Sequence, residues 1–248
     1  MRVPWPTGFP PVITHCAWRG AGTCLPDHDL YEAAKKGGDT DAALAVIDSV
    51  VDFDMLDRIV EFSPSVTARK PVLVAPTSAE ASGTNALPLA YALWLGQELG
   101  YDVCSTLYQY RGVKRDFCGA WHRLAFPTRL HGHIEEGADF ILVDDVCTLG
   151  GTLSEIAGFI VECGGRVIGS TCLASSDGGH VQLALSRKTE YALKEQFGDE
   201  LSALWTEEFG YDTRCLTEPE ASFLLRNGRN VGHIRDAIHR ARSAGDAH

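Results

Sequence analysis

The sequence predicts an α/β fold with a doubly wound, mostly parallel, Rossmann-like sheet. Between residues 71 and 174, short apolar runs alternate with longer stretches whose apolar residues fall at helical spacing, and Gly164 and Gly165 make a tight return between a helix and a strand. Strands that alternate with helices imply right-handed crossovers and a parallel sheet. We therefore expect a core at 70–180, preceded by an irregular and helical segment at 1–69 and followed by a helical extension at 181–248.

Composition narrows the class of protein. Of the 248 residues, 45% are hydrophobic and 22% are charged, which is typical of a globular chain. The formal net charge of -11 argues against broad affinity for nucleic acid or anionic membrane, because such binding needs accumulated Lys and Arg. No apolar run reaches the roughly 18 residues of a membrane span, and the first residues do not have the order of a signal peptide. We expect a cytoplasmic protein.

The elements follow in order along the chain. Residues 1–28 are rich in Pro and Gly and are predicted to be an irregular lead-in, and 29–62 are predicted to be helical with a break at Gly37 and Gly38. The core is predicted to contain strands at 71–76, 102–108, 141–143 and 166–174 and helices at 85–99 and 151–163. Beyond about 186 the pattern is helical, and Thr217 with Glu220 predicts a capping box.

A group of possible metal ligands lies near the N-terminus, at His15, Cys16, Cys24 and His28. Structural zinc sites usually carry ligands in pairs two to four residues apart, and the adjacent His15 and Cys16 do not fit that spacing. An ordinary loop is the favoured interpretation over a zinc site.

The most informative stretch is FILVDDVCTLGGTLSEIAGFI, at 140–160. An apolar strand leads to the carboxylates Asp144 and Asp145 at the edge of the sheet where open α/β proteins bind ligands. The predicted helix that follows starts within the Gly-rich segment 148–152, where unpaired backbone N–H groups favour an anion such as phosphate. A ligand with a diol at one side and a phosphate at the other matches both features.

Within this stretch, VDDVCTLGGT resembles the phosphoribosyl pyrophosphate signature of the type I phosphoribosyltransferases. The resemblance implies that Asp144 and Asp145 bind the ribose hydroxyls and a Mg²⁺ ion. It also implies that the 5-phosphate is wrapped by Thr148, Leu149, Gly150, Gly151 and Thr152. Leu149 departs from the family pattern, which usually has a small or hydroxylated residue there. The alternative interpretation is a buried strand, turn and helix with a solvated pair of acids.

The same resemblance implies roles for three other segments. A loop after the first core strand would contact the diphosphate, with Pro76, Ser82, Gly83 and Asn85 as candidates; the alternative is a plain helix N-terminus capped by Thr84 or Asn85. Segment 109–131 holds five Lys or Arg and one acid, a net charge of 5 − 1 = +4. It would form a mobile basic lid acting through Arg111, Lys114 and Arg115, or else a solvated basic loop. Asp177 is a further magnesium candidate, or part of a turn.

The function implied is transfer of a 5-phosphoribosyl group from phosphoribosyl pyrophosphate to a nitrogenous base, with Mg²⁺ and release of pyrophosphate. The alternative is a regulatory protein that senses phosphoribosyl pyrophosphate without turning it over. A dinucleotide-binding oxidoreductase is excluded because no GxGxxG follows an early strand. The helical segments outside the core would form a hood over the base. The expected partners are the sugar diphosphate and a small base, with no nucleic acid and no membrane; a homodimer stays an option.

Overall fold

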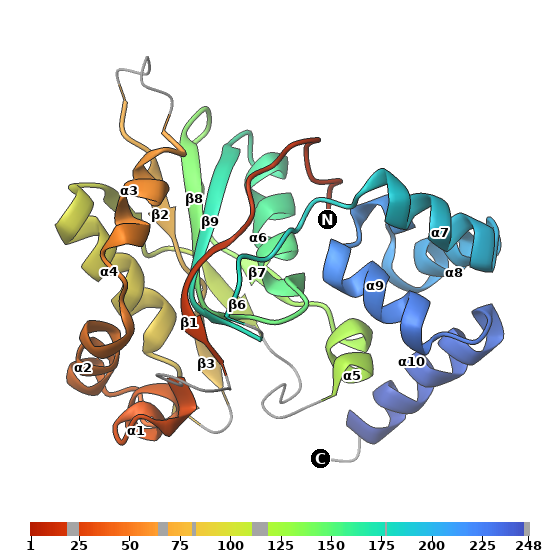
Figure 1. Cartoon of the computed structure of the whole chain (residues 1–248), viewed down its shortest axis with the longest axis horizontal. Coiled ribbons are helices and arrows are strands. Elements are labelled where there is room, and N and C mark those ends of the chain that lie inside the picture. The colour runs from red at the N-terminus through yellow and green to blue at the C-terminus, as the bar shows by residue number, and fades with distance from the viewer. Residues whose placement is uncertain (19–24, 64–68, 81–82, 111–118, 177, 246–248) are drawn as a thin grey trace.

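The computed structural model describes residues 1–18, 25–63, 69–80, 83–110, 119–176 and 178–245. Its centre is a five-stranded sheet in the order β1-β9-β8-β2-β5, and every neighbouring pair in it is parallel. The strands are β1 (Ile13–Ala17), β2 (Val72–Val74), β5 (Asp102–Cys104), β8 (Asp139–Cys147) and β9 (Arg166–Ser175). Helices cover both faces (Figure 1). The predicted α/β, doubly wound fold is therefore confirmed.

Each face of the sheet has its own apolar core. On one face, Leu73, Ile141 and Leu173 pack against helices from the first hundred residues: α1 (Tyr31–Lys36), α2 (Thr40–Val50), α3 (Asp54–Val60) and α4 (Leu87–Leu99). On the other face, Phe140 and Leu142 pack against α6 (Gly151–Glu162). Neighbouring residues of β8 contribute to different cores because successive side chains of a strand point to opposite faces. Burial on both faces explains the continuous apolar runs in the sequence.

The sheet reverses its order between β2 and β8. From β2 the chain moves outward to β5, and it then returns to place β8 on the other side of β2. Val74 of β2 pairs with Leu142 of β8, so the carboxyl ends of these two strands are neighbours. In open α/β sheets this reversal leaves a crevice in which ligands bind. The loops that follow β2 and β8 therefore meet at one place.

A second, smaller sheet extends this edge. It has the order β4-β3-β6-β7, with β3 (Thr77–Glu80), β4 (Gly83–Thr84), β6 (Tyr108–Tyr110) and β7 (Arg129–His131). The prediction of one strand at 102–108 is wrong, because the chain leaves the main sheet after Cys104 and joins the small sheet at Tyr108. In its described part, the basic segment 109–131 contains the last two residues of β6, the short helix α5 (Ala120–Ala125) and the strand β7.

The N-terminal lead-in is more regular than the sequence indicates. Residues 13–17 form β1, an edge strand that pairs with β9, so that Ile13 lies opposite Thr171 and Ala17 opposite Ser175. The prediction of an irregular segment over 1–28 is wrong for this part. The helical prediction for 29–62 is confirmed as α1, α2 and α3, with the break between α1 and α2 falling at Gly37 and Gly38.

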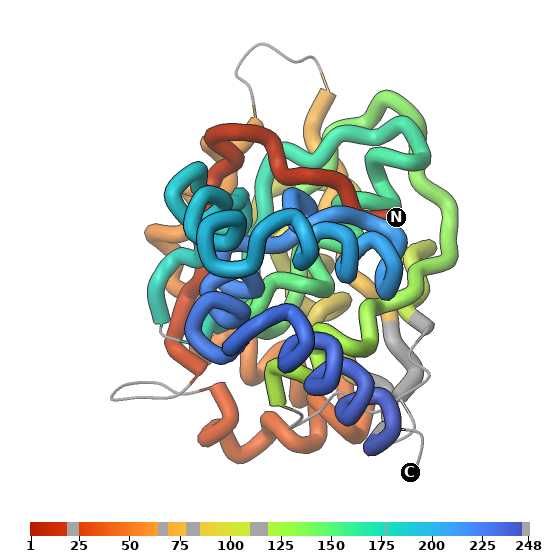
Figure 2. Tube along the Cα trace, turned by 90° about the vertical axis from the view of Figure 1, so that its right-hand side faces the viewer, coloured from red at the N-terminus to blue at the C-terminus, as the bar shows by residue number. Residues whose placement is uncertain are grey.

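The C-terminal residues form a helical unit with its own core. It consists of α7 (Arg187–Phe197), α8 (Glu200–Phe209), α9 (Glu218–Asn227) and α10 (Val231–Gly245), and α5 packs against it. Thr217 and Glu220 form the predicted capping box at the start of α9. Figures 1 and 2 show that the N-terminus lies beside these helices. Within the described ranges, none of the helices combines the length and apolar character that a membrane span requires.

Candidate functional site

The two acids lie near the carboxyl end of β8 and are both buried. Asp144 Oδ1 accepts a hydrogen bond from the amide of Asp145 at 2.9 Å, and Asp145 Oδ1 accepts one from the amide of Val146 at 2.9 Å. Buried carboxylates are costly unless they are hydrogen-bonded or paired. These local bonds hold the two carboxylates in place at the reversal point of the sheet.

Asp145 has two further partners, one of which the sequence did not indicate. Its Oδ2 accepts a hydrogen bond from Nδ2 of Asn85 at 3.0 Å, which brings together a predicted residue of the loop after β2 and a predicted acid of β8. The same oxygen lies 2.6 Å from Nζ of Lys35, at the end of α1. Lys35 is 14% exposed and Asp145 is 8% exposed, so this ion pair is largely shielded from solvent. The acid pair is therefore not a solvated turn.

Segment 148–152 leads into helix α6 through a residue with a left-handed backbone conformation. Gly150 is the N-cap of α6 and has φ 75°, a left-handed conformation that side chains disfavour. Its carbonyl accepts the first bond of the helix, from the amide of Ser154 at 3.0 Å. A Cβ at Gly150 would come within 2.4 Å of Leu183 Cδ2. Glycine is required here by both the backbone and the packing.

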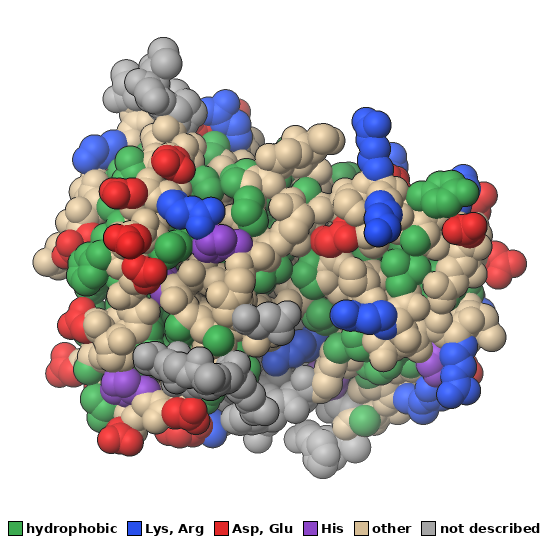
Figure 3. All heavy atoms as spheres, viewed as in Figure 1, with side chains coloured by type: hydrophobic (Ala, Val, Ile, Leu, Met, Phe, Trp, Pro, Cys, Tyr) green, Lys and Arg blue, Asp and Glu red, His purple; other side chains and the backbone are tan. Residues whose placement is uncertain are grey.

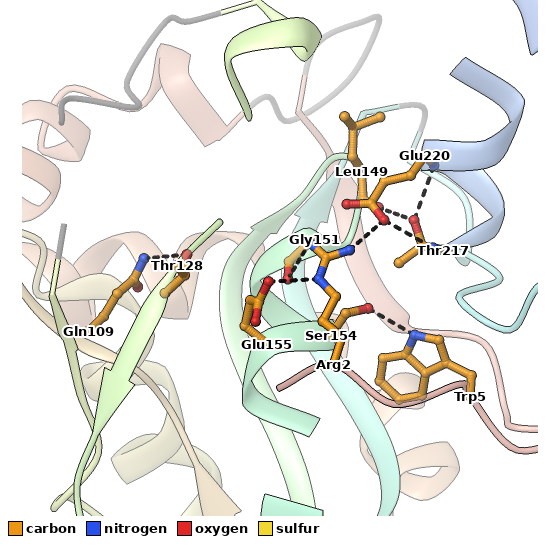
Figure 4. Close-up of polar contacts among 10 residues, drawn as sticks. All are labelled: Arg2, Trp5, Gln109, Thr128, Leu149, Gly151, Ser154, Glu155, Thr217 and Glu220. Atoms are coloured by element: carbon orange, nitrogen blue, oxygen red, sulfur yellow. Dashed lines mark hydrogen bonds and ion pairs between the residues drawn. The ribbon is translucent and has the colours of Figure 1, made fainter. Parts of the chain in front are cut away.

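The C-terminal helical unit contacts segment 148–152 through a hydrogen bond and through apolar packing at Leu149. The Thr217 hydroxyl donates to the carbonyl of Leu149 at 2.5 Å, and the Leu149 side chain packs against the core of that unit (Figure 4). Leu149, the one departure from the family pattern, is thus an apolar contact between the loop and the helices. From α5, Arg123 Nη1 donates to the Thr148 hydroxyl at 3.1 Å. Arg123 was predicted only as part of the basic segment, and its position beside Thr148 places a cation next to segment 148–152.

The buried side chain of Arg2 also contacts this segment, at Gly151, and pairs with two acids. Arg2 Nε pairs with Glu155 at 2.7 Å, and its Nη1 pairs with Glu220 at 2.7 Å (Figure 4). Burial disfavours the charge on Arg2, but the carboxylates of Glu220 and Glu155 outweigh burial and raise its pKa above the usual range. Its Nη2 also reaches the carbonyl of Gly151 at 3.4 Å. Arg2 therefore joins α6 to the capping box of α9.

The other predicted site residues have different outcomes. Pro76 is buried directly after β2, and Gly83 lies in β4, where it pairs with Glu80. Thr152 lies in the first turn of α6 and is half-buried. Five predicted residues lie outside the described ranges: Ser82, Arg111, Lys114, Arg115 and Asp177. The lid and the third magnesium candidate therefore stay predictions.

The acids fit a magnesium ion only in part. Asp145 has both carboxylate oxygens engaged, by Lys35 and Asn85 on one side and by the Val146 amide on the other. Mg²⁺ prefers octahedral oxygen ligands and usually keeps several waters and phosphate oxygens. No group of three His, Cys, Asp or Glu suited to a metal is found within the ranges that the structure describes. A Mg²⁺ ion on Oδ2 of Asp145 would lie beside the Lys35 ammonium group, so these contacts disfavour direct ligation at that oxygen.

The possible metal ligands near the N-terminus, for which a zinc site was disfavoured, have other partners where the structure describes them. His15 lies in β1 and bonds Tyr91 through Nε2 at 2.5 Å, and Cys16 donates to the carbonyl of Leu173 at 3.4 Å. His28 accepts a hydrogen bond from the amide of Leu30 at 3.1 Å. Cys24 lies outside the described residues.

Charge is unevenly distributed over one face of the molecule. Acidic side chains gather over the half that contains α1 to α4, whereas Lys and Arg are more frequent over the C-terminal helices (Figure 3). Between the halves the surface is hollowed, and basic side chains are visible in the hollow (Figure 3).

Comparison with known proteins gives two curated relatives. Protein TraN of Escherichia coli is 33% identical over 242 residues, which cover 98% of this chain and 52% of that protein. An uncharacterised protein of Haemophilus influenzae is 32% identical over 162 residues, 65% of this chain and 34% of that protein. The chain therefore spans about half the length, or less, of these relatives. No family model matches the chain.

Solved structures similar to this chain include phosphoribosyltransferases. Adenine phosphoribosyltransferase from Thermoanaerobacter pseudethanolicus is 19% identical with a TM-score of 0.33, covering 56% of this chain and 71% of that one. Purine phosphoribosyltransferase from Pyrococcus horikoshii is 18% identical with a TM-score of 0.33, covering 50% of this chain and 69% of that one. At values this low, neither structure assigns an activity to this chain.

Proposed function

We propose that this chain binds phosphoribosyl pyrophosphate and transfers its 5-phosphoribosyl group to a nitrogenous base. The observation that carries the proposal is the sequence of features at the end of β8. Two buried carboxylates are followed, five residues after Asp145, by the left-handed Gly150 that begins α6. A vicinal diol and a phosphate on one small ligand match these two features, because carboxylates accept hydroxyl hydrogens and helix N-termini bind phosphate.

In this proposal each group has a separate task. Asp144 and Asp145 accept hydrogen bonds from the ribose hydroxyls, and the backbone of 148–152 holds the 5-phosphate with the help of Arg123. Such contacts fix the sugar so that an acceptor nitrogen attacks C1 while pyrophosphate leaves, and catalysis rests on positioning and charge stabilisation. Magnesium would accompany the diphosphate and neutralise part of its charge. Arg111, Lys114 and Arg115 are proposed to close over the diphosphate.

A protein that senses the ligand without turning it over is the alternative. In the sequence, Leu149 favoured that alternative because it removes one side-chain bond to phosphate. In the structure, the Leu149 side chain packs against the C-terminal core, and Arg123 donates to the neighbouring Thr148. Leu149 therefore has a packing role that an enzyme and a sensor share, and it no longer favours the sensor.

The first test is calorimetric titration with phosphoribosyl pyrophosphate. We expect the wild type to bind, and the double variant Asp144→Asn/Asp145→Asn to bind at least about tenfold more weakly, since charge-assisted hydrogen bonds to the hydroxyls are lost. Asp139→Asn is the matched control, because Asp139 lies at the other end of β8 and pairs with the exposed Arg166. A folded wild type that does not bind rules out the proposal. Pyrophosphate release in the presence of candidate bases then separates the enzyme from the sensor.

A further inference from the structure

The ion pair between Lys35 and Asp145 is unusual for its position. Lys35 belongs to α1, outside the central sheet, yet its Nζ lies 2.6 Å from a carboxylate in the middle of the proposed sugar site. The next residue, Lys36, pairs with Glu32 on the exposed side of the same helix. Two adjacent lysines thus have opposite environments. Burying an ammonium group is costly unless it is paired, so the placement of Lys35 requires a compensating interaction.

A backbone hydrogen bond next to Lys35 fixes the position of α1 relative to the start of α4. The carbonyl of Ala34 accepts a hydrogen bond from the amide of Ala86 at 3.0 Å, which joins α1 to the start of α4. Asn85, the residue before Ala86, donates to the same Asp145 oxygen as Lys35 does. The helix that carries Lys35 and the loop that carries Asn85 therefore reach Asp145 as one unit.

These contacts disfavour a divalent cation on Oδ2 of Asp145. Its Oδ2 receives Lys35 and Asn85, and its Oδ1 receives the amide of Val146. A Mg²⁺ ion at bonding distance from Oδ2 would lie close to the ammonium group and be repelled by it. An ammonium group carries three donors, so one lysine can bind a carboxylate and an anionic ligand oxygen together.

We infer that Lys35 is a built-in cation of the sugar-phosphate site, which takes at Asp145 the place of a directly bound divalent metal and donates to the ligand's diphosphate. This inference rests on the proposed function. It predicts that ligand binding by the wild type depends only weakly on Mg²⁺, and that removal of the ammonium makes Asp145 a metal ligand. Lys35 would then decide how strongly the site depends on metal.

The test compares the wild type with Lys35→Met, Lys35→Arg and the control Lys36→Met, all as full chains checked for folding by circular dichroism. The first measurement uses Mn²⁺ alone, followed by its electron paramagnetic resonance signal. We expect Lys35→Met to bind Mn²⁺ at least about tenfold more tightly than the wild type, because two carboxylates lose their neutralising charge. Lys35→Arg and Lys36→Met should match the wild type. Equal Mn²⁺ affinity in Lys35→Met and the wild type overturns the inference.

The second measurement is calorimetry with phosphoribosyl pyrophosphate in EDTA and in excess Mg²⁺. In EDTA, Lys35→Met should bind at least about tenfold more weakly than the wild type, with Mg²⁺ restoring part of the loss. If the wild type needs Mg²⁺ as much as Lys35→Met does, the inference fails while the proposed function stands. If the wild type binds in neither condition, the proposed function fails, and the role of Lys35 at a diphosphate fails with it.

Discussion

Two buried ion-pair clusters of this protein have similar chemistry and different surroundings. Arg2 is 3% exposed and is enclosed by Glu155 and Glu220, where the N-terminal segment, α6 and α9 meet. Lys35 is more exposed, and it pairs with one acid at the point where the sheet reverses its order. The comparison teaches that burial of a charge does not identify a functional site. The position relative to the carboxyl ends of the strands distinguishes the two clusters.

The Arg2 cluster should give the largest effect on stability. Arg2→Met leaves the buried Glu220 and the half-buried Glu155 without their cation, and we expect the free energy of unfolding to fall by about 3–5 kcal/mol, measured by urea denaturation. Lys35→Met should cost less, because Asp145 keeps its bonds from Asn85 and Val146. Arg214→Met is the control for an exposed pair, with Asp212, and should cost about 0–1 kcal/mol. An equal loss in Arg2→Met and Arg214→Met contradicts the structural role of Arg2.

A third polar group, the half-buried His15, sharpens the comparison because it is neutral. Its Nδ1 lies 3.1 Å from the amide nitrogen and 3.2 Å from the carbonyl oxygen of Asp52, and its Nε2 bonds the Tyr91 hydroxyl. The Tyr91 hydroxyl lies 2.9 Å from that of Thr171. Burial lowers the pKa of His15 to about 4. The backbone and the carboxylate of Asp52 favour a charge on this ring, but burial outweighs them.

The shift of His15 predicts the pH dependence of stability. Between pH 6.5 and pH 4, the unfolded chain takes up a proton on His15 that the folded chain does not, so acidification favours unfolding. The contribution of this residue is complete above pH 6.5 and falls by about 3 kcal/mol as the pH approaches 4. We expect urea denaturation of His15→Gln to show a shallower decline over this range than the wild type. Parallel stability profiles would show that His15 does not carry the effect.

The sequence predicted the parts of this fold that depend on local pattern. Strands β2, β8 and β9, the helix α4 and the Thr217–Glu220 capping box all have signals within a few residues. The sequence did not predict β1, because Pro and Gly surround it and its pairing partner in β9 lies about 158 residues away. It likewise predicted the acids and the loop at 148–152 but not Lys35. Lys35 and Lys36 are indistinguishable in sequence, and only tertiary packing assigns one to the site and the other to solvent.

The smallest predicted effect on stability concerns Thr217, which connects Glu220 of the Arg2 cluster to segment 148–152. Its hydroxyl accepts the amide of Glu220 at 3.1 Å and donates to the Leu149 carbonyl. Thr217→Val keeps the shape and removes both bonds, so we expect a loss of about 1–2 kcal/mol in unfolding free energy. Because Leu149 precedes Gly150, ribose 5-phosphate should also bind several-fold more weakly by calorimetry, whereas Thr217→Ser should restore binding.

The control is Ser186→Ala, which removes the N-cap of α7. If Ser186→Ala weakens the ligand as much as Thr217→Val does, the effect is general destabilisation; if only Thr217→Val weakens it, the C-terminal helices position the loop.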